Sequence, residues 1–250
     1  MRLQGKTAVV TGGASGLGAA ATWALAEAGA DVFFTWKRNA DAGAALIEKV
    51  RTLGRKAAGC SLDATDPGQV QAFAGAVRSF SPHVDILFNN AGDMVRRMTL
   101  PEVTPELVRQ VMDVNVLSTI LVTQALLALI PKGGSVINMS SLAARNGGGP
   151  GAGIYAAAKG AVLTLTRAWA KEFADRNIRV NCVSPGVIDT DFHVRHSKPE
   201  TLMPQMARDL PARKAGVAED VARAVVFLAG EGSGFIAGES IEINGGMAFA

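Results

Sequence analysis

Near its N-terminus the chain reads Thr11-Gly12-Gly13-Ala14-Ser15-Gly16-Leu17-Gly18. This segment follows an apolar run at residues 6–10 and opens an alanine-rich stretch, which is the order strand, turn, helix. Glycines there let the backbone approach a pyrophosphate, and the helix start offers free N–H groups and a positive dipole. The spacing is G-x-x-x-G-x-G rather than G-x-G-x-x-G, and an ordinary tight turn is the alternative interpretation. The context favours a dinucleotide site formed by Gly12, Ser15, Gly16, Leu17 and Gly18.

Short apolar runs and helical patterns alternate along the rest of the chain. The runs predict strands at residues 6–10, 31–35, 56–62, 85–89, 135–139, 179–183 and 240–243. Between them, Asp66-Pro67 and Thr104-Pro105 each join an N-cap residue to a proline at the first helical position. Such alternation is typical of βαβ units and of a parallel sheet covered on both faces. Because no repeat or linker interrupts it, we expect one α/β domain over residues 1–250 with a doubly wound, parallel, seven-stranded sheet.

Composition excludes several classes of protein. Of the 250 residues, 48% are hydrophobic and 19% are charged, which indicates a packed core rather than disorder. The net charge is +3 and no run of Lys or Arg exceeds two residues, so nucleic-acid binding is not favoured. The three histidines, His83, His193 and His196, have no metal-ligand spacing. We therefore expect them at the surface, and we expect no metal site.

Three features bear on where the protein works. The first residues lack the charged, apolar and small-residue regions of a signal peptide. The apolar stretch 114–130 is interrupted by polar residues, which favours a buried helix over a membrane span. Two cysteines, Cys60 and Cys182, indicate a reduced compartment rather than a disulfide framework. These features predict a cytoplasmic protein that has no membrane partner.

The end of the second predicted strand bears on the choice of dinucleotide. An acidic residue about 20 positions after the glycine-rich turn would hold the ribose 2′-hydroxyl of NAD. This chain has Trp36, Lys37 and Arg38 there, and no carboxylate before Asp41. A carboxylate would repel a 2′-phosphate, whereas Lys37 and Arg38 would attract it. We favour NADP(H) over NAD(H), the alternative being that these are solvated charges at a helix start.

Tyr155 is the only tyrosine in the chain, and Lys159 follows it by four residues. On a helix the two share one face, and a neighbouring ammonium favours the phenolate, so we expect the pKa of Tyr155 to fall below its usual value of about 10. A lowered pKa suits a general acid and base at neutral pH, while a surface pair is the alternative. Ser141 follows the predicted strand 135–139, and the ends of parallel strands share one crevice with the ligand.

These motifs together resemble the classical short-chain dehydrogenases/reductases over essentially the whole chain. The resemblance rests on the glycine-rich turn, Asn89-Asn90-Ala91-Gly92, Asn115, Ser141, Tyr155, Lys159, Pro185-Gly186, Thr190 and Asn244-Gly245-Gly246. It implies a Rossmann fold with strand order 3-2-1-4-5-6-7, and a homotetramer in which helices 104–129 and 154–175 pair across a two-fold axis. In that order Cys60 and Cys182 lie about 24 Å apart, so both should be free thiols.

The resemblance also implies roles for individual residues. Tyr155 would donate a proton to a substrate carbonyl oxygen, Ser141 would hydrogen-bond that oxygen, and Lys159 would hold the nicotinamide ribose. Asn115 would anchor a water that relays protons to Lys159. One residue more than usual precedes Tyr155, in the glycine-rich loop 147–151, and Ser141 rather than Ser140 is taken as the catalytic serine. The cofactor set adds Trp36, Lys37, Arg38, Asp63 (toward the adenine), Asn90, Ala91, Gly92, Pro185, Gly186, Ile188 and Thr190 (toward the carboxamide), besides Tyr155 and Lys159.

Residues 191–214 form the least regular part of the sequence and are expected to be a mobile lid over the substrate. Basic side chains crowd its first part, and Arg145 lies in the facing loop. With no carboxylate between Phe192 and Lys198 to offset them, they would favour an anionic substrate. The alternative is that they point to solvent. The basic residues in question are His193, Arg195, His196 and Lys198.

Three functions remain open at this point. The first is an NADP(H)-dependent oxidoreductase that transfers a hydride between nicotinamide and a carbonyl or secondary alcohol of a small molecule. Within the family, segments 147–153 and 189–193 look similar to reductases of keto sugar acids such as 4-deoxy-5-ketouronate. The second is a 3-oxoacyl-(acyl-carrier-protein) reductase. The third is a non-catalytic NADP-binding sensor, which the intact set of Ser141, Tyr155 and Lys159 argues against.

Overall fold

Within residues 3–249, which the computed structural model describes, seven parallel strands form one sheet in the order β3-β2-β1-β4-β5-β6-β7. The strands are β1 (Thr7–Val10), β2 (Asp31–Trp36), β3 (Ala57–Ser61), β4 (Ile86–Asn89), β5 (Ser135–Met139), β6 (Arg179–Pro185) and β7 (Ser240–Ile243). The predicted fold class and strand order are confirmed. The bounds of β5 and β7 match the prediction, and the others differ from it by one or two residues.

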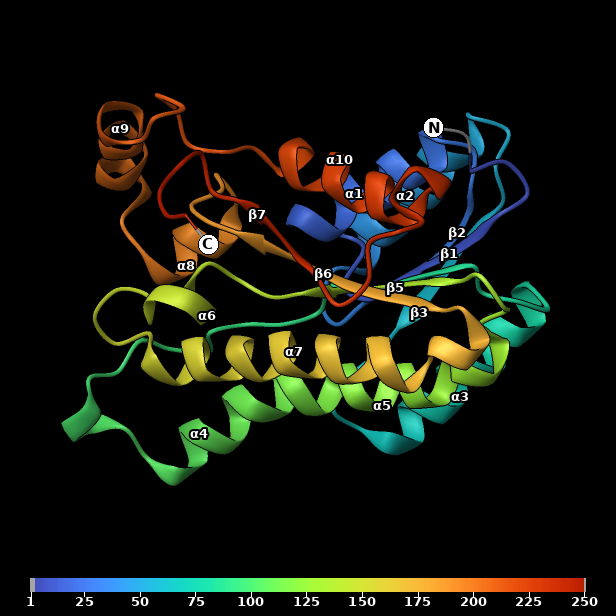
Figure 1. Ribbon diagram of the computed structural model, residues 1–250, viewed down its shortest axis with the longest axis horizontal. Coiled ribbons are helices and arrows are strands. Elements are labelled where there is room, and N and C mark those ends of the chain that lie inside the picture. Colours follow the sequence, from blue (N-terminus) through green and yellow to red (C-terminus); the bar gives the residue numbers. More distant parts are fainter. Residues whose placement is uncertain (1–2, 250) are drawn as a thin grey trace.

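Helices cover both faces of this sheet (Figure 1). One face carries α1 (Gly16–Glu27), α2 (Ala40–Arg51) and α10 (Ala218–Ala229), and the other carries α3 (Pro67–Phe80), α5 (Ser118–Leu126) and α7 (Gly153–Glu172). Strand β1 shows why both faces are needed: Ala8 and Val10 pack toward α1 and α10, whereas Val9 packs toward α3 and α5. All three side chains are fully buried, which is why the strand is a continuous run of apolar residues.

The long helix predicted over residues 104–129 is not regular. It consists of α4 (Pro105–Met112), a π-helical turn (Asp113–Leu117), α5 and a short 3₁₀ turn (Leu127–Leu129). By length and composition the stretch Pro105–Leu129 could cross a membrane, since its most apolar 18-residue window has a mean hydropathy of 1.6. It lies against α3 and α7 inside the fold, and 39% of its most apolar window is buried there.

Three short helices stand beyond the carboxyl ends of the strands. They are α6 (Ala143–Asn146), α8 (Asp191–His196) and α9 (Pro199–Asp209). The segment expected to be the least regular, 191–214, therefore contains two helices, and Pro199 at the start of α9 separates it from α8. Figure 1 shows α6, α8 and α9 at the same end of the molecule. Cys60 on β3 and Cys182 on β6 are free thiols, as predicted.

Candidate functional site

A cleft of about 1380 Å³ opens at the carboxyl ends of the strands. It brings together the whole predicted cofactor set, although the strands that carry these residues lie far apart in sequence. Of the four predicted catalytic residues, Ser141, Tyr155 and Lys159 line the cleft, and Asn115 lies behind it. The predicted cofactor residues in the lining are Gly12, Ser15, Gly16, Leu17, Gly18, Trp36, Lys37, Arg38, Asp63, Asn90, Ala91, Gly92, Tyr155, Lys159, Pro185, Gly186, Ile188 and Thr190.

The glycine-rich turn between β1 and α1 forms one wall of the cleft. Gly16 has φ 51°, in the left-handed region that glycine adopts readily. A side chain on Gly18 would place its Cβ 2.1 Å from the carbonyl oxygen of Gly12, so only glycine fits there. Ser15 is the N-cap of α1, but its side chain makes no capping hydrogen bond. The first N–H groups of α1 therefore face the cleft without a side-chain cap, as a bound pyrophosphate requires.

The far end of the cleft is lined by the residues that follow β2. The ammonium of Lys37 lies 2.6 Å from the carboxylate of Asp63. This hydrogen bond holds the pKa of Asp63 below its usual value, against the opposing effect of burial. Lys37 is thus already paired, which the sequence did not predict. Among residues 3–249, Arg38 forms no ion pair with a carboxylate, so its charge can meet a 2′-phosphate at this end.

Ser141, Tyr155 and Lys159 meet at the other end of the cleft. The Nζ atom of Lys159 donates a hydrogen bond to the carbonyl oxygen of Met139 over 2.8 Å and lies 5.7 Å from the centre of the Tyr155 ring. Ser140 is buried and donates to the carbonyl oxygen of Lys159, whereas the Ser141 hydroxyl interacts with Tyr155. The structure therefore places Ser141, not Ser140, beside the tyrosine.

The predicted lowering of the Tyr155 pKa is wrong. Burial raises the pKa of Tyr155 to about 12, and the negative charge of Asp93 adds to this, while the hydrogen bond with Ser141 lowers it only in part. Burial also lowers the pKa of Lys159 to about 8. Desolvation of the buried ring, which the spacing of Tyr155 and Lys159 does not reveal, is the largest cause of this shift. Tyr155 is consequently a phenol, and therefore a proton donor, throughout the neutral range.

Asn115 is fully buried in the π-helical turn rather than exposed to the cleft. Its Nδ2 donates to the carbonyl oxygens of Asp93 (2.7 Å) and Val111 (2.8 Å), and its Oδ1 has no partner among the described residues. A Cβ on Gly92 would lie 2.6 Å from this oxygen and 3.0 Å from Nζ of Lys159. A polar space therefore joins Asn115 to Lys159 beside Gly92, and the cleft as a whole fits a nicotinamide dinucleotide.

Three of the basic side chains expected at the substrate end, Arg195, His196 and Arg145, are paired with carboxylates, contrary to expectation. Asp93, which the sequence reasoning missed, accepts hydrogen bonds from both Arg195 and His196 at 2.7 Å. Arg145 pairs with Glu242 at 2.7 Å. No carboxylate lies between Phe192 and Lys198 in the sequence, but the fold brings Asp93 from the loop after β4 to Arg195 and His196. The only signal for Asp93 was its place directly after Asn89-Asn90-Ala91-Gly92.

His83 lies at the surface as predicted, with its side chain 46% exposed, but His193 and His196 do not. The side chain of His196 is only 6% exposed, beside Asp93. Burial lowers the pKa of His193, and the charge of nearby Arg97 acts in the same direction. His193 is therefore a neutral ring in the cleft wall at neutral pH. Among residues 3–249, no group of three or more His, Cys, Asp or Glu side chains could hold a metal ion.

The fold and the cleft define a dinucleotide-binding α/β protein with a tyrosine and lysine pair in the cleft wall. A family model described as enoyl-(acyl carrier protein) reductase matches residues 12–248. The 3-oxoacyl-[acyl-carrier-protein] reductase FabG of Thermotoga maritima is 36% identical over 256 residues, covering 99% of each chain. The chain belongs to the short-chain dehydrogenase/reductase family of oxidoreductases.

Solved structures agree with this assignment. A blue fluorescent protein from a metagenomic library, in complex with NADPH, superposes with a TM-score of 0.92 at 35% identity over 100% of both chains. A short chain dehydrogenase from Burkholderia cenocepacia J2315, in complex with NADP, gives 0.91 at 34% identity over 98% of this chain and 99% of the other.

Proposed function

We propose that this protein is an NADP(H)-dependent oxidoreductase that transfers a hydride between nicotinamide and a carbonyl or secondary alcohol. One observation carries the proposal: Ser141, Tyr155 and Lys159 meet at one end of a cleft whose other end holds the glycine-rich turn and Arg38. The similar proteins crystallised with NADPH and with NADP support this choice of cofactor.

A bound nicotinamide supplies the hydride, and the residues of the chain handle the charge that this transfer creates. Negative charge develops on the carbonyl oxygen, and a phenol with a pKa of about 12 still carries the proton that this oxygen needs. Ser141 hydrogen-bonds the same oxygen, and both contacts strengthen as the charge grows. Lys159 holds the nicotinamide ribose and, with Asn115 and a water beside Gly92, replaces the proton that Tyr155 gives up.

Substrate-dependent oxidation of NADPH tests the proposal and separates it from its alternatives. A panel of keto uronates, aldoses and acetoacetyl thioesters distinguishes a sugar or sugar-acid reductase from a 3-oxoacyl-(acyl-carrier-protein) reductase, the activity of the Thermotoga relative. Tyr155→Phe keeps the ring but removes the proton, so turnover should fall by at least about a hundredfold while NADPH binding persists. Near wild-type turnover in this variant would contradict the assignment, and NADPH binding without any turnover would favour a sensor.

Within this function the substrate that we favour is an anion such as a keto sugar acid. Arg97 supports this idea, because it lines the substrate end of the cleft and, among residues 3–249, forms no ion pair with a carboxylate. Its Nε and Nη1 donate to the carbonyl oxygens of His196 and Pro150. These contacts orient the guanidinium and leave its charge for the substrate.

We also assign a lid, an assembly and a location. Residues 191–214, the lid segment, cover the substrate end of the one domain. The protein is a cytoplasmic homotetramer, and the apolar stretch Pro105–Leu129, of which much lies outside the core, supports pairing with a second copy. Light scattering at micromolar concentration tests the assembly, and a stable monomer would contradict it.

A further inference from the structure

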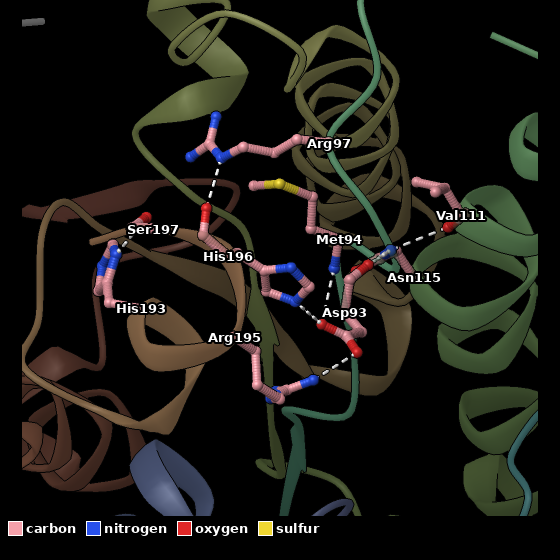
Figure 2. Close-up of polar contacts among 9 residues, drawn as sticks. All are labelled: Asp93, Met94, Arg97, Val111, Asn115, His193, Arg195, His196 and Ser197. Carbon is pink, nitrogen blue, oxygen red and sulfur yellow. Dashed lines mark hydrogen bonds and ion pairs between the residues drawn. The ribbon is translucent and has the colours of Figure 1, made fainter. Parts of the chain in front are cut away.

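A cluster of hydrogen-bonded polar side chains outside the catalytic set surrounds Asp93, in the loop that follows β4 (Figure 2). Its Oδ1 accepts a hydrogen bond from Nε2 of His196 at 2.7 Å and from the N–H of Met94 at 2.9 Å. Its Oδ2 accepts from Nη1 of Arg195 at 2.7 Å. Both oxygens of one carboxylate are therefore engaged, and two of the three donors belong to helix α8.

The backbone of Asp93 is held as firmly as its side chain. Its carbonyl oxygen accepts a hydrogen bond from Nδ2 of Asn115, which is buried in the π-helical turn. The residue that fixes the backbone of Asp93 is therefore Asn115, which is also a member of the predicted catalytic set. A second contact secures the end of α8: Arg97, four residues after Asp93, bridges the carbonyl oxygens of His196 and Pro150.

Helix α8 carries the aromatic side chain that faces the reacting tyrosine. The rings of Phe192 and Tyr155 lie 5.8 Å apart between centres, and the ring of His196 lies 4.8 Å from that of Phe192. Phe192 and His193 both line the cleft. A chain of contacts therefore runs from Asp93 through His196 and Phe192 to Tyr155.

We propose that Asp93 is a positioning residue that fastens α8 over Tyr155 and so completes the substrate-binding wall. The inference rests on the oxidoreductase function proposed above. What it claims about the structure is that Asp93 holds α8 in its closed position, which can be measured without catalysis. Without the carboxylate, the guanidinium of Arg195 and the ring of His196 lose their shared acceptor, and α8 opens more often. A substrate that binds only under a closed α8 then binds more weakly, in proportion to the closed fraction.

Asp93→Asn is the direct variant. The asparagine can still accept from the N–H of Met94, but its amide group presents a donor to Arg195, which has only donors to offer. His196→Gln removes the partner ring from the other side. Glu48→Gln is the matched control, because Glu48 also accepts from an arginine, Arg51, but on the exposed surface of α2.

Hydrogen–deuterium exchange of peptides covering residues 190–200, with saturating NADPH as the only added ligand, reads the position of α8 without any catalysis. Exchange should be about tenfold faster in Asp93→Asn and in His196→Gln, and unchanged in Glu48→Gln. In the double variant the two effects should be less than additive in free energy, because the Asp93–His196 contact that both changes remove can be lost only once. Unchanged exchange in Asp93→Asn, or additive effects in the double variant, would overturn the proposal.

Kinetics then tests the positioning role, with the carbonyl compound of the panel that the wild type reduces. In Asp93→Asn the KM for that compound should rise about tenfold while kcat stays within about twofold, since saturation restores the closed state. Asp93→Glu, which keeps the charge, should recover part of the loss. A fall in kcat with unchanged KM would contradict the role. A wild type that reduces nothing would refute the proposed function, and exchange would still decide the position of α8.

Discussion

The carboxylate of Asp93 and the imidazole of His196 lie 2.7 Å apart, although 103 residues separate them in the chain. The pair joins the loop after β4 to helix α8, and the same carboxylate offsets the charge of Arg195 beside the cleft. Burial alone would raise the pKa of Asp93, but hydrogen bonds from His196 and Arg195 outweigh it and hold the pKa below its usual value. Asp93 is therefore ionised at neutral pH.

The ionisation of Tyr155 can be followed directly, because it is the only tyrosine. Burial raises its pKa to about 12, so the folded protein without cofactor should show no phenolate absorbance up to about pH 10. In urea the same residue should titrate at about pH 10. The Tyr155→Phe variant gives the baseline. Half-formed phenolate at pH 8 in the folded protein would show that the charge of Lys159 outweighs burial after all.

Lys159 should make stability depend on pH in the opposite sense from a lysine whose charge is stabilised by an ion pair. Burial lowers its pKa to about 8 from 10.5, so between these values the unfolded chain binds a proton that the folded chain has released. The free energy of unfolding then rises with pH across this window, whereas below pH 8 both states are charged and the burial cost is present in full. Between pH 7 and 9.5 the wild type should gain about 2 kcal/mol relative to Lys159→Met in urea denaturation. A constant difference between the two proteins would contradict the shift.

Cofactor choice should depend on Arg38 more than on Lys37, because Lys37 is already paired with Asp63. We expect kcat/KM to favour NADPH over NADH in the wild type. Arg38→Asp should shrink that ratio by about tenfold or more, since it exchanges an attraction for the 2′-phosphate for a repulsion. Arg78→Asp, on α3 outside the cleft, controls for the change in net charge. Equal use of both cofactors by the wild type would remove the NADP assignment.

The preference for an anionic over a neutral substrate should depend on Arg97. Arg97→Gln should raise the KM of a keto acid about tenfold more than that of its neutral amide analogue, because it removes a charge in addition to the contact with His196 that secures α8 for both substrates. Added salt should weaken the preference in the wild type. Arg96→Gln is the matched control, because Arg96 is an exposed neighbour that does not line the cleft. Loss of the Arg195 side chain should affect acid and amide alike, because it acts through Asp93. Equal efficiency for both analogues at low salt would exclude the sugar-acid substrate.

The architecture was predictable because the strands are buried on both faces, and such strands consist of short runs of apolar residues. The runs at 135–139 and 240–243 gave strand bounds without error. The glycine-rich turn and the spacing of Tyr155 and Lys159 were equally local signals, and the fold brings them into one cleft. A family resemblance added the residues that no local pattern distinguishes, such as Asn115.

The remaining features depend on distances that no sequence pattern contains. The pairing of Asp93 with Arg195 and His196 requires two loops to meet at one end of the sheet. The high pKa of Tyr155 follows from its surroundings, not from its neighbour four residues on. Helix α8 is held by polar contacts to residues about 100 positions away in the chain, which no local pattern shows.

The strand order also has a consequence for biosynthesis. β1 pairs with β4, and the pair forms only after the ribosome has added the residues between Val10 and Ile86. The last strand, β7, pairs with β6, and the N–H of Gly186 in the cleft wall donates to Ile243. Met247, seven residues after the start of β7, lines the cleft as well. A nascent chain therefore exposes the unpaired edge of β6 until β7 has been synthesised, and chaperone protection matters most at that stage.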